Sequence, residues 1–213
     1  MNYYRKDGKL PVILEVEEVE KLLSIPNKRY ITGLRNLAIL RIMLDMGLRV
    51  SEVADLRPGN INLTNRKLRV VNSKGGRDRD LAIPLETIEV LKEWKQRKPK
   101  DSQYFFTTIK DRKGKVTFKN GTQRDITSRP GDKISVRNIQ AMIEKYVKRA
   151  GIDKKITPHT LRHTYATEYY RQTKDIETLR RILGHADIST TTIYITLANI
   201  DVENGMKSFK VLA

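Results

Sequence analysis

The sequence predicts a mainly α-helical protein with a small antiparallel three-stranded β-sheet, which is an α+β fold. Apolar residues recur at helical spacing over most of the chain, whereas only three short runs resemble strands. The 213 residues, 38% of them hydrophobic, are enough for one domain with its own core. We therefore expect one domain at residues 14–213, preceded by a polar, basic linker or arm at residues 1–13.

Three helices are predicted before the sheet. Pro26 ends the first of them, because proline cannot continue a helix. The second is apolar on most sides and is therefore expected to be buried, and Gly47 is a natural residue for its C-terminal end. Ser51 is predicted to begin the third, which leads into a turn at 57–60. These helices span residues 14–23, 34–46 and 52–56.

The predicted sheet consists of strands at residues 61–63, 68–72 and 80–83. Residues 73–76 contain two glycines and are expected to form the hairpin between the last two strands, because glycine accepts positive φ. An amphipathic helix at 84–97 and a short buried segment at 104–106 follow. Residues 107–133 are polar and basic, and we interpret them as an exposed loop or a loose hairpin.

The C-terminal part is predicted to be helical. Ser135 and Thr157 are typical N-cap residues, and Pro158 suits the first helical position, where its missing N–H is not needed. Ser189 or Thr190 is expected to cap the last helix. The four predicted helices span residues 135–150, 158–172, 176–183 and 190–197, and a short mixed tail follows at 202–212.

The charge balance indicates a polyanionic partner. The chain has 42 Lys and Arg against 25 Asp and Glu, a net charge of +17, and nucleic acid is the usual partner of such a domain. A basic surface that serves solubility, or a ribosome-associated role, is the alternative. The absence of cysteine excludes disulfides and thiol nucleophiles. No apolar run approaches the ~20 residues that span a membrane, and we expect a cytoplasmic, nucleoid-associated protein.

The start of the predicted helix at 158–172 has the chemistry of a phosphate site. His159 and Arg162 are three residues apart, share a face, and lie in the first turn, where the helix dipole favours anions. His159 and His163 also have the spacing of helix-borne zinc ligands, but Thr160 replaces the usual Glu and Arg162 would repel a dication. We therefore expect no metal, and we expect His163 to be a packed residue with a supporting role.

A few residues of the types that bind phosphate or attack it follow one another in a specific order along the chain. They are Arg49 after a glycine, Lys74 in the hairpin, His159 and Arg162 with His163, His185 after Gly184, and Tyr194 nine residues later. No one of these positions is persuasive alone, but their order closely resembles the tyrosine recombinase (phage integrase) family, over residues 14–197. The resemblance implies the catalytic-domain fold of DNA breaking-rejoining enzymes.

The resemblance also implies a role for each residue. Arg49 and Arg162 would hold the non-bridging oxygens of a phosphodiester, and Tyr194 would attack the phosphorus. His159 would be the base or proton acceptor, and His185 would hydrogen-bond a phosphate oxygen. Lys74 would protonate the departing 5′ oxygen.

Glu52 lies one helical turn from Arg49, so it either orients that arginine or is a helix-cap carboxylate.

The implied reaction is site-specific DNA recombination through a 3′-phosphotyrosyl intermediate, without cofactor, ATP or metal. The implied partner is double-stranded DNA that carries recombination sites, bound by a homo-tetramer that is a monomer or weak oligomer without DNA. Arg137, Asn138 and Gln140 either read base edges or form a solvated helix face. A topoisomerase IB-like or telomere-resolving enzyme, or a non-catalytic DNA-binding protein, is the alternative.

Three features depart from the family pattern. The N-terminal core-binding domain is absent, so the chain is expected to be an isolated catalytic domain or a naturally minimal recombinase. Residues 107–133 are longer than expected and could contact DNA, contact a partner, or form a tolerated surface loop. The short tail offers an apolar stripe that could fold back on its own chain or dock on a neighbouring protomer, and we expect the second, on DNA. The stripe consists of Met206, Phe209, Val211 and Leu212.

Overall fold

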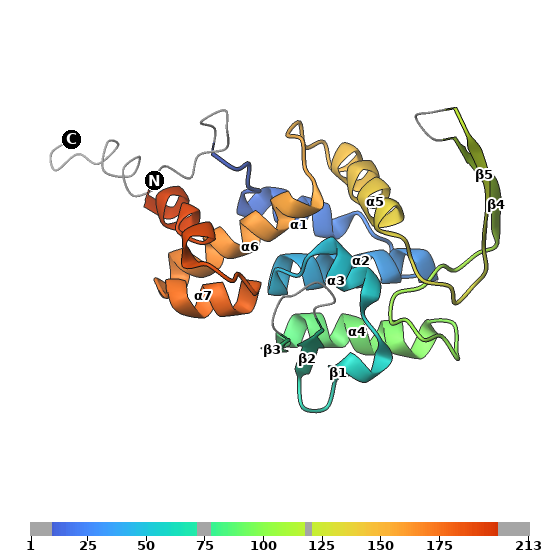
Figure 1. The fold of residues 1–213 in the computed structure, drawn as a ribbon, viewed down its shortest axis with the longest axis horizontal. Helices are drawn as coiled ribbons and strands as arrows, with labels where there is room; N and C mark the ends of the chain where they lie inside the picture. The colour runs from blue at the N-terminus through green and yellow to red at the C-terminus, as the bar shows by residue number, and fades with distance from the viewer. Residues whose placement is uncertain (1–9, 72–77, 118–120, 200–213) are drawn as a thin grey trace, which may run out of the picture.

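The computed structural model describes residues 10–71, 78–117 and 121–199 of the chain (Figure 1). Helices dominate it, together with two small antiparallel sheets, as the sequence predicts. Within the described ranges, no helix has the length and apolar character that crossing a bilayer requires. Lys74 and the predicted tail at 202–212 lie outside the described residues.

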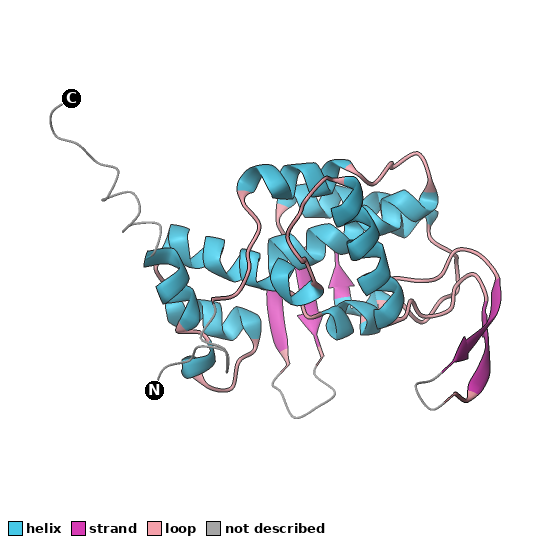
Figure 2. Cartoon of the chain, turned by 90° about the horizontal axis from the view of Figure 1, so that it is seen from above, coloured by secondary structure: helices cyan, strands magenta, loops and turns pink. Residues whose placement is uncertain are grey.

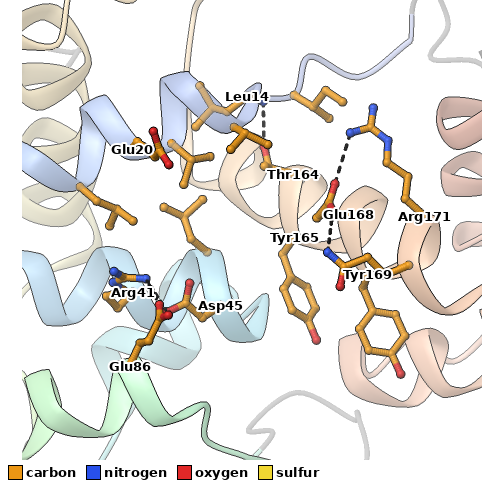
Figure 3. Close-up of a pocket in the computed structure, with 16 residues that line it drawn as sticks. Leu14, Glu20, Arg41, Asp45, Glu86, Thr164, Tyr165, Glu168, Tyr169 and Arg171 are labelled. Carbon is orange, nitrogen blue, oxygen red and sulfur yellow. Dashed lines mark hydrogen bonds and ion pairs between the residues drawn. The ribbon is translucent and has the colours of Figure 1, made fainter. Parts of the chain in front are cut away.

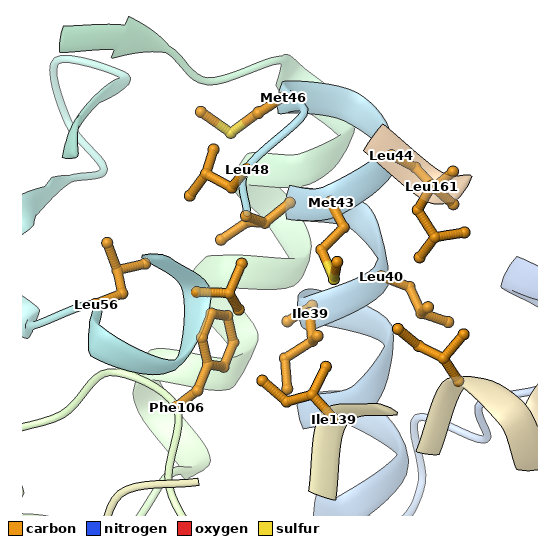
Figure 4. Close-up of a cluster of buried hydrophobic side chains, with 14 of the residues drawn as sticks. Ile39, Leu40, Met43, Leu44, Met46, Leu48, Leu56, Phe106, Ile139 and Leu161 are labelled. Atoms are coloured by element: carbon orange, nitrogen blue, oxygen red, sulfur yellow. The ribbon is translucent and has the colours of Figure 1, made fainter. Parts of the chain in front are cut away.

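Helix α2 (Ile31–Met46) is the centre of the main core, and α4 (Leu85–Arg97) and α6 (Pro158–Thr173) pack against it. Its side chains are buried on most sides, which agrees with its largely apolar sequence. Met43, Ile39 and Leu40 meet side chains from several other elements in one continuous cluster (Figure 4). The core therefore fixes the C-terminal end of α2, after which the predicted site begins.

The three-stranded sheet has the order β1-β2-β3 and is antiparallel throughout. Leu68 and Val70 of β2 and Leu81 of β3 turn inward onto the core, and their neighbours along the strands face outward. The strands span Ile61–Asn62, Lys67–Val70 and Arg79–Ala82. The predicted sheet is confirmed, and residues 72–77 of its β2–β3 connection lie outside the described residues.

Residues 107–133 form a hairpin, so the second of our two interpretations is correct. Strands β4 (Arg112–Thr117) and β5 (Gln123–Ser128) pair antiparallel. An isolated bridge between Thr107 and Lys133 closes the base of the hairpin, where Thr107 is buried. Figures 1 and 2 both show the two strands extending away from the helical body.

The remaining helices are α1 (Val16–Ser24), α3 (Val50–Asp55), α5 (Val136–Arg149), α7 (Ile176–Leu183) and a last one at 193–199. Near the C-terminal end a second group of buried apolar side chains consists of Ala166, Leu179, Leu183, Tyr194 and Leu197. Leu10 and Ile13 pack against this group, so the described end of the predicted linker belongs to the body of the protein.

Two N-caps are confirmed and two are wrong. Ser135 accepts a hydrogen bond from the Asn138 N–H, and Thr157 accepts one from the Thr160 N–H. Ser51 does not begin α3, because the N-cap is Arg49.

Neither Ser189 nor Thr190 caps the last helix. Asp187 accepts the Ser189 N–H and draws both residues into a short 3₁₀ turn, Ile188–Thr190, before the helix at 193–199. The predicted cap residues thus belong to a separate turn that Asp187 caps, and the last helix begins beyond them.

Replacing Gly47 with alanine is expected to lower the free energy of unfolding by about 2–4 kcal/mol. Gly47 has φ +65°, and a Cβ atom there would lie 2.4 Å from Cδ1 of Tyr165. Urea denaturation measures the change. Gly59→Ala is the control, since nothing lies within 4 Å of its added Cβ. Equal losses in the two variants would contradict this account.

Candidate active site

Arg162 joins the ends of two helices. Its guanidinium donates from Nη1 to the Gly47 carbonyl at 2.7 Å and from Nη2 to the Leu183 carbonyl at 2.6 Å. Gly47 is the C-cap of α2 and Leu183 is the last residue of α7. Both are helix C-terminal ends, which carry partial negative charge and so stabilise a buried cation. The sequence pattern places Arg162 near the start of α6, and the contacts turn it inward, where 4% of it is exposed.

Burial, followed by repulsion from Arg49, lowers the pKa of Arg162 to about 10. Arg162 therefore remains a cation at neutral pH, held in a largely desolvated position. A cation in such a position attracts a phosphate oxygen more strongly than an exposed one, because water screens it less.

Glu52 connects Arg49 to a second arginine, Arg79. The Arg49 N–H and its Nη1 both donate to the Glu52 carboxylate, at 2.8 and 3.0 Å, so Glu52 caps α3 and also orients Arg49. The two interpretations of Glu52 are therefore both correct. Arg79, from β3, donates its two Nη atoms to the same carboxylate, each at 2.9 Å. Burial alone would raise the pKa of Glu52, but the hydrogen bonds and charge of Arg79 outweigh burial and lower it.

Arg79 is a residue of the site that the sequence interpretation missed. It also donates from Nε to the Ile182 carbonyl at 2.6 Å, so one side chain ties the sheet to α3 and α7. The alternating charges of Arg-Asp-Arg-Asp at 77–80 are typical of a solvent-exposed segment, which is why the sequence did not single out Arg79. Strand parity could have found it, because Arg79 lies two residues from the inward-facing Leu81.

His185 follows Gly184, the C-cap of α7, and lies beside Arg162. Its Nε2 is 3.1 Å from Nη2 of Arg162, and its Nδ1 is 3.0 Å from Oγ1 of Thr191. Burial, then the charges of Arg162 and Arg49, lower the pKa of His185 to about 4. The ring is therefore neutral at pH 7. Because a guanidinium can only donate, Nε2 accepts and Nδ1 donates to Thr191.

Tyr194 lies in the helix at 193–199 with 2% of its surface exposed. Its hydroxyl is 3.1 Å from Nδ1 of His163. Burial raises the pKa of Tyr194, and the charges of Arg162 and Arg49 act in the opposite direction. The phenol is thus within electrostatic range of both predicted arginines.

The structure brings most of the predicted residues together but not all. We call Arg49, Glu52, Arg79, Arg162 and His185 the Arg162 cluster, and Tyr194 with His163 lies beside it. His159 is exposed in the first turn of α6, and no described contact joins it to the cluster. Arg137 and Gln140 are exposed on α5, and Asn138 is half-buried there.

A surface groove lies apart from the predicted site residues. A groove of about 530 Å³ lies between α1, α2 and α6, lined by Leu14, Asp45 and Thr164 among others (Figure 3). None of the predicted site residues lines it. Among the described residues, no group of three or more His, Cys, Asp or Glu side chains could hold a metal ion.

Replacing Arg79 with glutamine is expected to lower the free energy of unfolding by about 3 kcal/mol, because it removes one partner of a buried ion pair. Thermal and urea unfolding measure the change. Arg69 is the control, since it lies on the neighbouring strand β2 in an exposed pair with Asp78. Arg69→Gln is expected to change stability by no more than about 0.5 kcal/mol. The account is wrong if the two variants lose the same stability.

Comparison with known proteins identifies the family. The model of the phage integrase family matches residues 13–199. Tyrosine recombinase XerA of Pyrococcus furiosus is 35% identical over 185 residues, which cover 87% of this chain and 57% of that protein. The chain thus spans less than two thirds of the length of this curated relative.

Solved structures agree on the fold. A crystal structure of XerA recombinase has a TM-score of 0.73 at 27% identity and covers 95% of this chain and 67% of its own. The Tn1549 transposon integrase, solved in complex with a circular intermediate DNA, has a TM-score of 0.68 at 18% identity and covers 93% of this chain and 67% of its own, which supports the fold alone. On the match of the family model over most of its length, the chain belongs to the phage integrase family of tyrosine recombinases.

Proposed function

We propose that this chain cuts and rejoins DNA in site-specific recombination, by transesterification through a 3′-phosphotyrosyl bond at Tyr194 and without ATP or metal. The observation that supports this most directly is the position of Tyr194 beside the buried Arg162 and the half-buried Arg49. XerA, the relative described above, is named a tyrosine recombinase.

The chemistry of a phosphodiester explains why such a site needs arginines. Negative charge repels a nucleophile and increases on the phosphoryl oxygens as the transition state forms, so fixed cations accelerate the reaction. Arg162 and Arg49 can each place two N–H groups on these oxygens. Arg162 is already held by two carbonyls, so it needs little reorganisation when the phosphate arrives.

The phosphotyrosyl bond has similar energy to the phosphodiester that it replaces, so a 5′ hydroxyl can attack it to rejoin DNA. Attack by the 5′ end of a second duplex exchanges strands.

We propose Lys74 as the acid for the departing 5′ oxygen. His159, exposed at the N-terminus of α6, would contact the phosphate from the open side of the site. His185 would donate from Nε2 to a phosphate oxygen in its other tautomer, in which Nδ1 accepts from Thr191 and the contact with Arg162 is given up.

Double-stranded DNA fits the charge of the protein. The net charge of +17 favours a polyanion through the release of counterions, and the Tn1549 integrase was solved in complex with DNA. We propose that the working form is a homo-tetramer on paired sites, with the protein monomeric or weakly associated without DNA. The exposed residues Arg137 and Gln140, with Asn138, would read base edges from α5.

Replacing Tyr194 with phenylalanine is expected to abolish covalent capture of DNA and leave binding within about twofold, since only the nucleophilic oxygen is lost. The substrate is a library of nicked duplexes of randomised sequence, which trap the cut strand. Denaturing gels and sequencing of the attached DNA give the yield and the site. Tyr30→Phe is the control, since 68% of Tyr30 is exposed. Covalent capture by the Tyr194 variant would refute the assignment.

Replacing Arg137, Asn138 and Gln140 together with alanine is expected to relax sequence preference at a few positions of the captured DNA. Each lost base contact corresponds to about 1–3 kcal/mol of discrimination. Sequencing of captured DNA measures this. Lys145→Ala, further along the exposed side of α5, is the control and is expected to weaken binding equally for all sequences. Uniform weakening in the triple variant as well would show that α5 contacts only phosphates.

A further inference from the structure

His163 makes a hydrogen bond that neither the family resemblance nor the proposed function uses. Its Nδ1 lies 3.1 Å from the hydroxyl oxygen of Tyr194, and the two rings are 5.8 Å apart with a 49° angle between their planes. The two residues are 31 positions apart in the chain. Tyr194 is almost completely buried, so few groups can reach its oxygen.

The nucleophile must lose its proton as its bond to phosphorus forms, so some group has to accept that proton. Glu52 is already occupied, because both of its oxygens accept hydrogen bonds from Arg49 and Arg79. His185 is occupied as well, because one ring nitrogen accepts from Arg162 and the other contacts Thr191.

The other two described histidines, both on α6, differ in their position relative to the phenol. His159 is exposed in the first turn, whereas His163 is half-buried one turn further on and is the one in contact with the phenol. A neutral imidazole can accept a proton at the nitrogen that faces the hydroxyl. A proton acceptor needs this heavy-atom distance of about 2.6–3.2 Å.

We propose that His163, rather than His159, accepts the Tyr194 proton during DNA cleavage. This rests on the proposed function. As the Tyr194 oxygen bonds to phosphorus and the bond to the 5′ oxygen breaks, the phenol proton moves to Nδ1 of His163. The 5′ oxygen takes its proton from the general acid. In rejoining, the His163 imidazolium returns its proton to the tyrosine oxygen as the phosphotyrosyl bond breaks.

The charged groups around this pair favour the transfer. Arg162 precedes His163 on α6, Arg49 lies between α2 and α3, and both attract a phenolate. His185, which follows α7, is within electrostatic range of His163 and is neutral at pH 7. Arg79 acts on His185 from β3. These groups influence the pH dependence of cleavage, and the variants compared below leave all of them unchanged.

The test compares His163→Asn with His159→Asn. Asparagine keeps a polar atom near the Nδ1 position and cannot accept a proton. The rate of covalent adduct formation is measured from pH 6 to 9.5 on the nicked duplex that wild-type protein captures best. His163→Asn is expected to be slower by about 100-fold at pH 7. Its deficit should shrink as pH rises, because the phenolate fraction grows about tenfold per pH unit below the pKa of Tyr194, which burial raises.

His159→Asn is expected to have a deficit that stays constant with pH. A third variant, His163→Ala, should regain adduct formation as free imidazole is added, which a merely structural role would not produce. Circular dichroism and DNA binding check that each variant folds. If His163→Asn does not fold, the rescue of His163→Ala by imidazole decides the outcome.

The proposal is overturned if His163→Asn cleaves as fast as wild type or faster, if its deficit is constant with pH, or if imidazole restores nothing. Faster cleavage would mean that the hydrogen bond to His163 holds Tyr194 in a position from which it does not attack DNA. Failure of wild-type protein to form any adduct would instead refute the proposed function, so the two failures are distinguishable.

Discussion

The buried guanidinium of Arg162 is the interaction on which the site depends. A cation removed from water is unfavourable unless every N–H group finds an acceptor. Arg162 meets part of that demand with carbonyls at the C-terminal ends of α2 and α7 and with a ring nitrogen of His185. The requirement that stabilises the cation therefore also fixes the ends of two helices around it. A phosphate oxygen would complete the set of acceptors.

The carboxylate of Glu52 balances the positive charge that the site accumulates. Arg49 and Arg79 both bind it, so two cations lie close together without full mutual repulsion. Arg79 also reaches the Ile182 carbonyl, and the small sheet is thereby connected to the end of α7. The sheet thus contributes to the site through a strand residue.

Much of the fold and most of the site could be predicted because their signals are local. Helix periodicity, Gly47 at the end of α2, and Ser135 and Thr157 as caps depend on neighbouring residues alone. The misses depend on competition or on distant contacts. Asp187 caps a 3₁₀ turn that contains Ser189 and Thr190, and Arg79 acquires its role from Glu52, 27 residues away. The contact of His163 with Tyr194 needs the folded chain in the same way.

The most direct test of the central claim is the chemical identity of the bond between protein and DNA. The trapped complex is digested with nuclease and trypsin, and the peptides are sequenced by mass spectrometry. The account predicts a nucleotide joined through its 3′ phosphate to Tyr194, in the tryptic peptide 182–207. A nucleotide on another residue, or one joined through a 5′ phosphate, would contradict it.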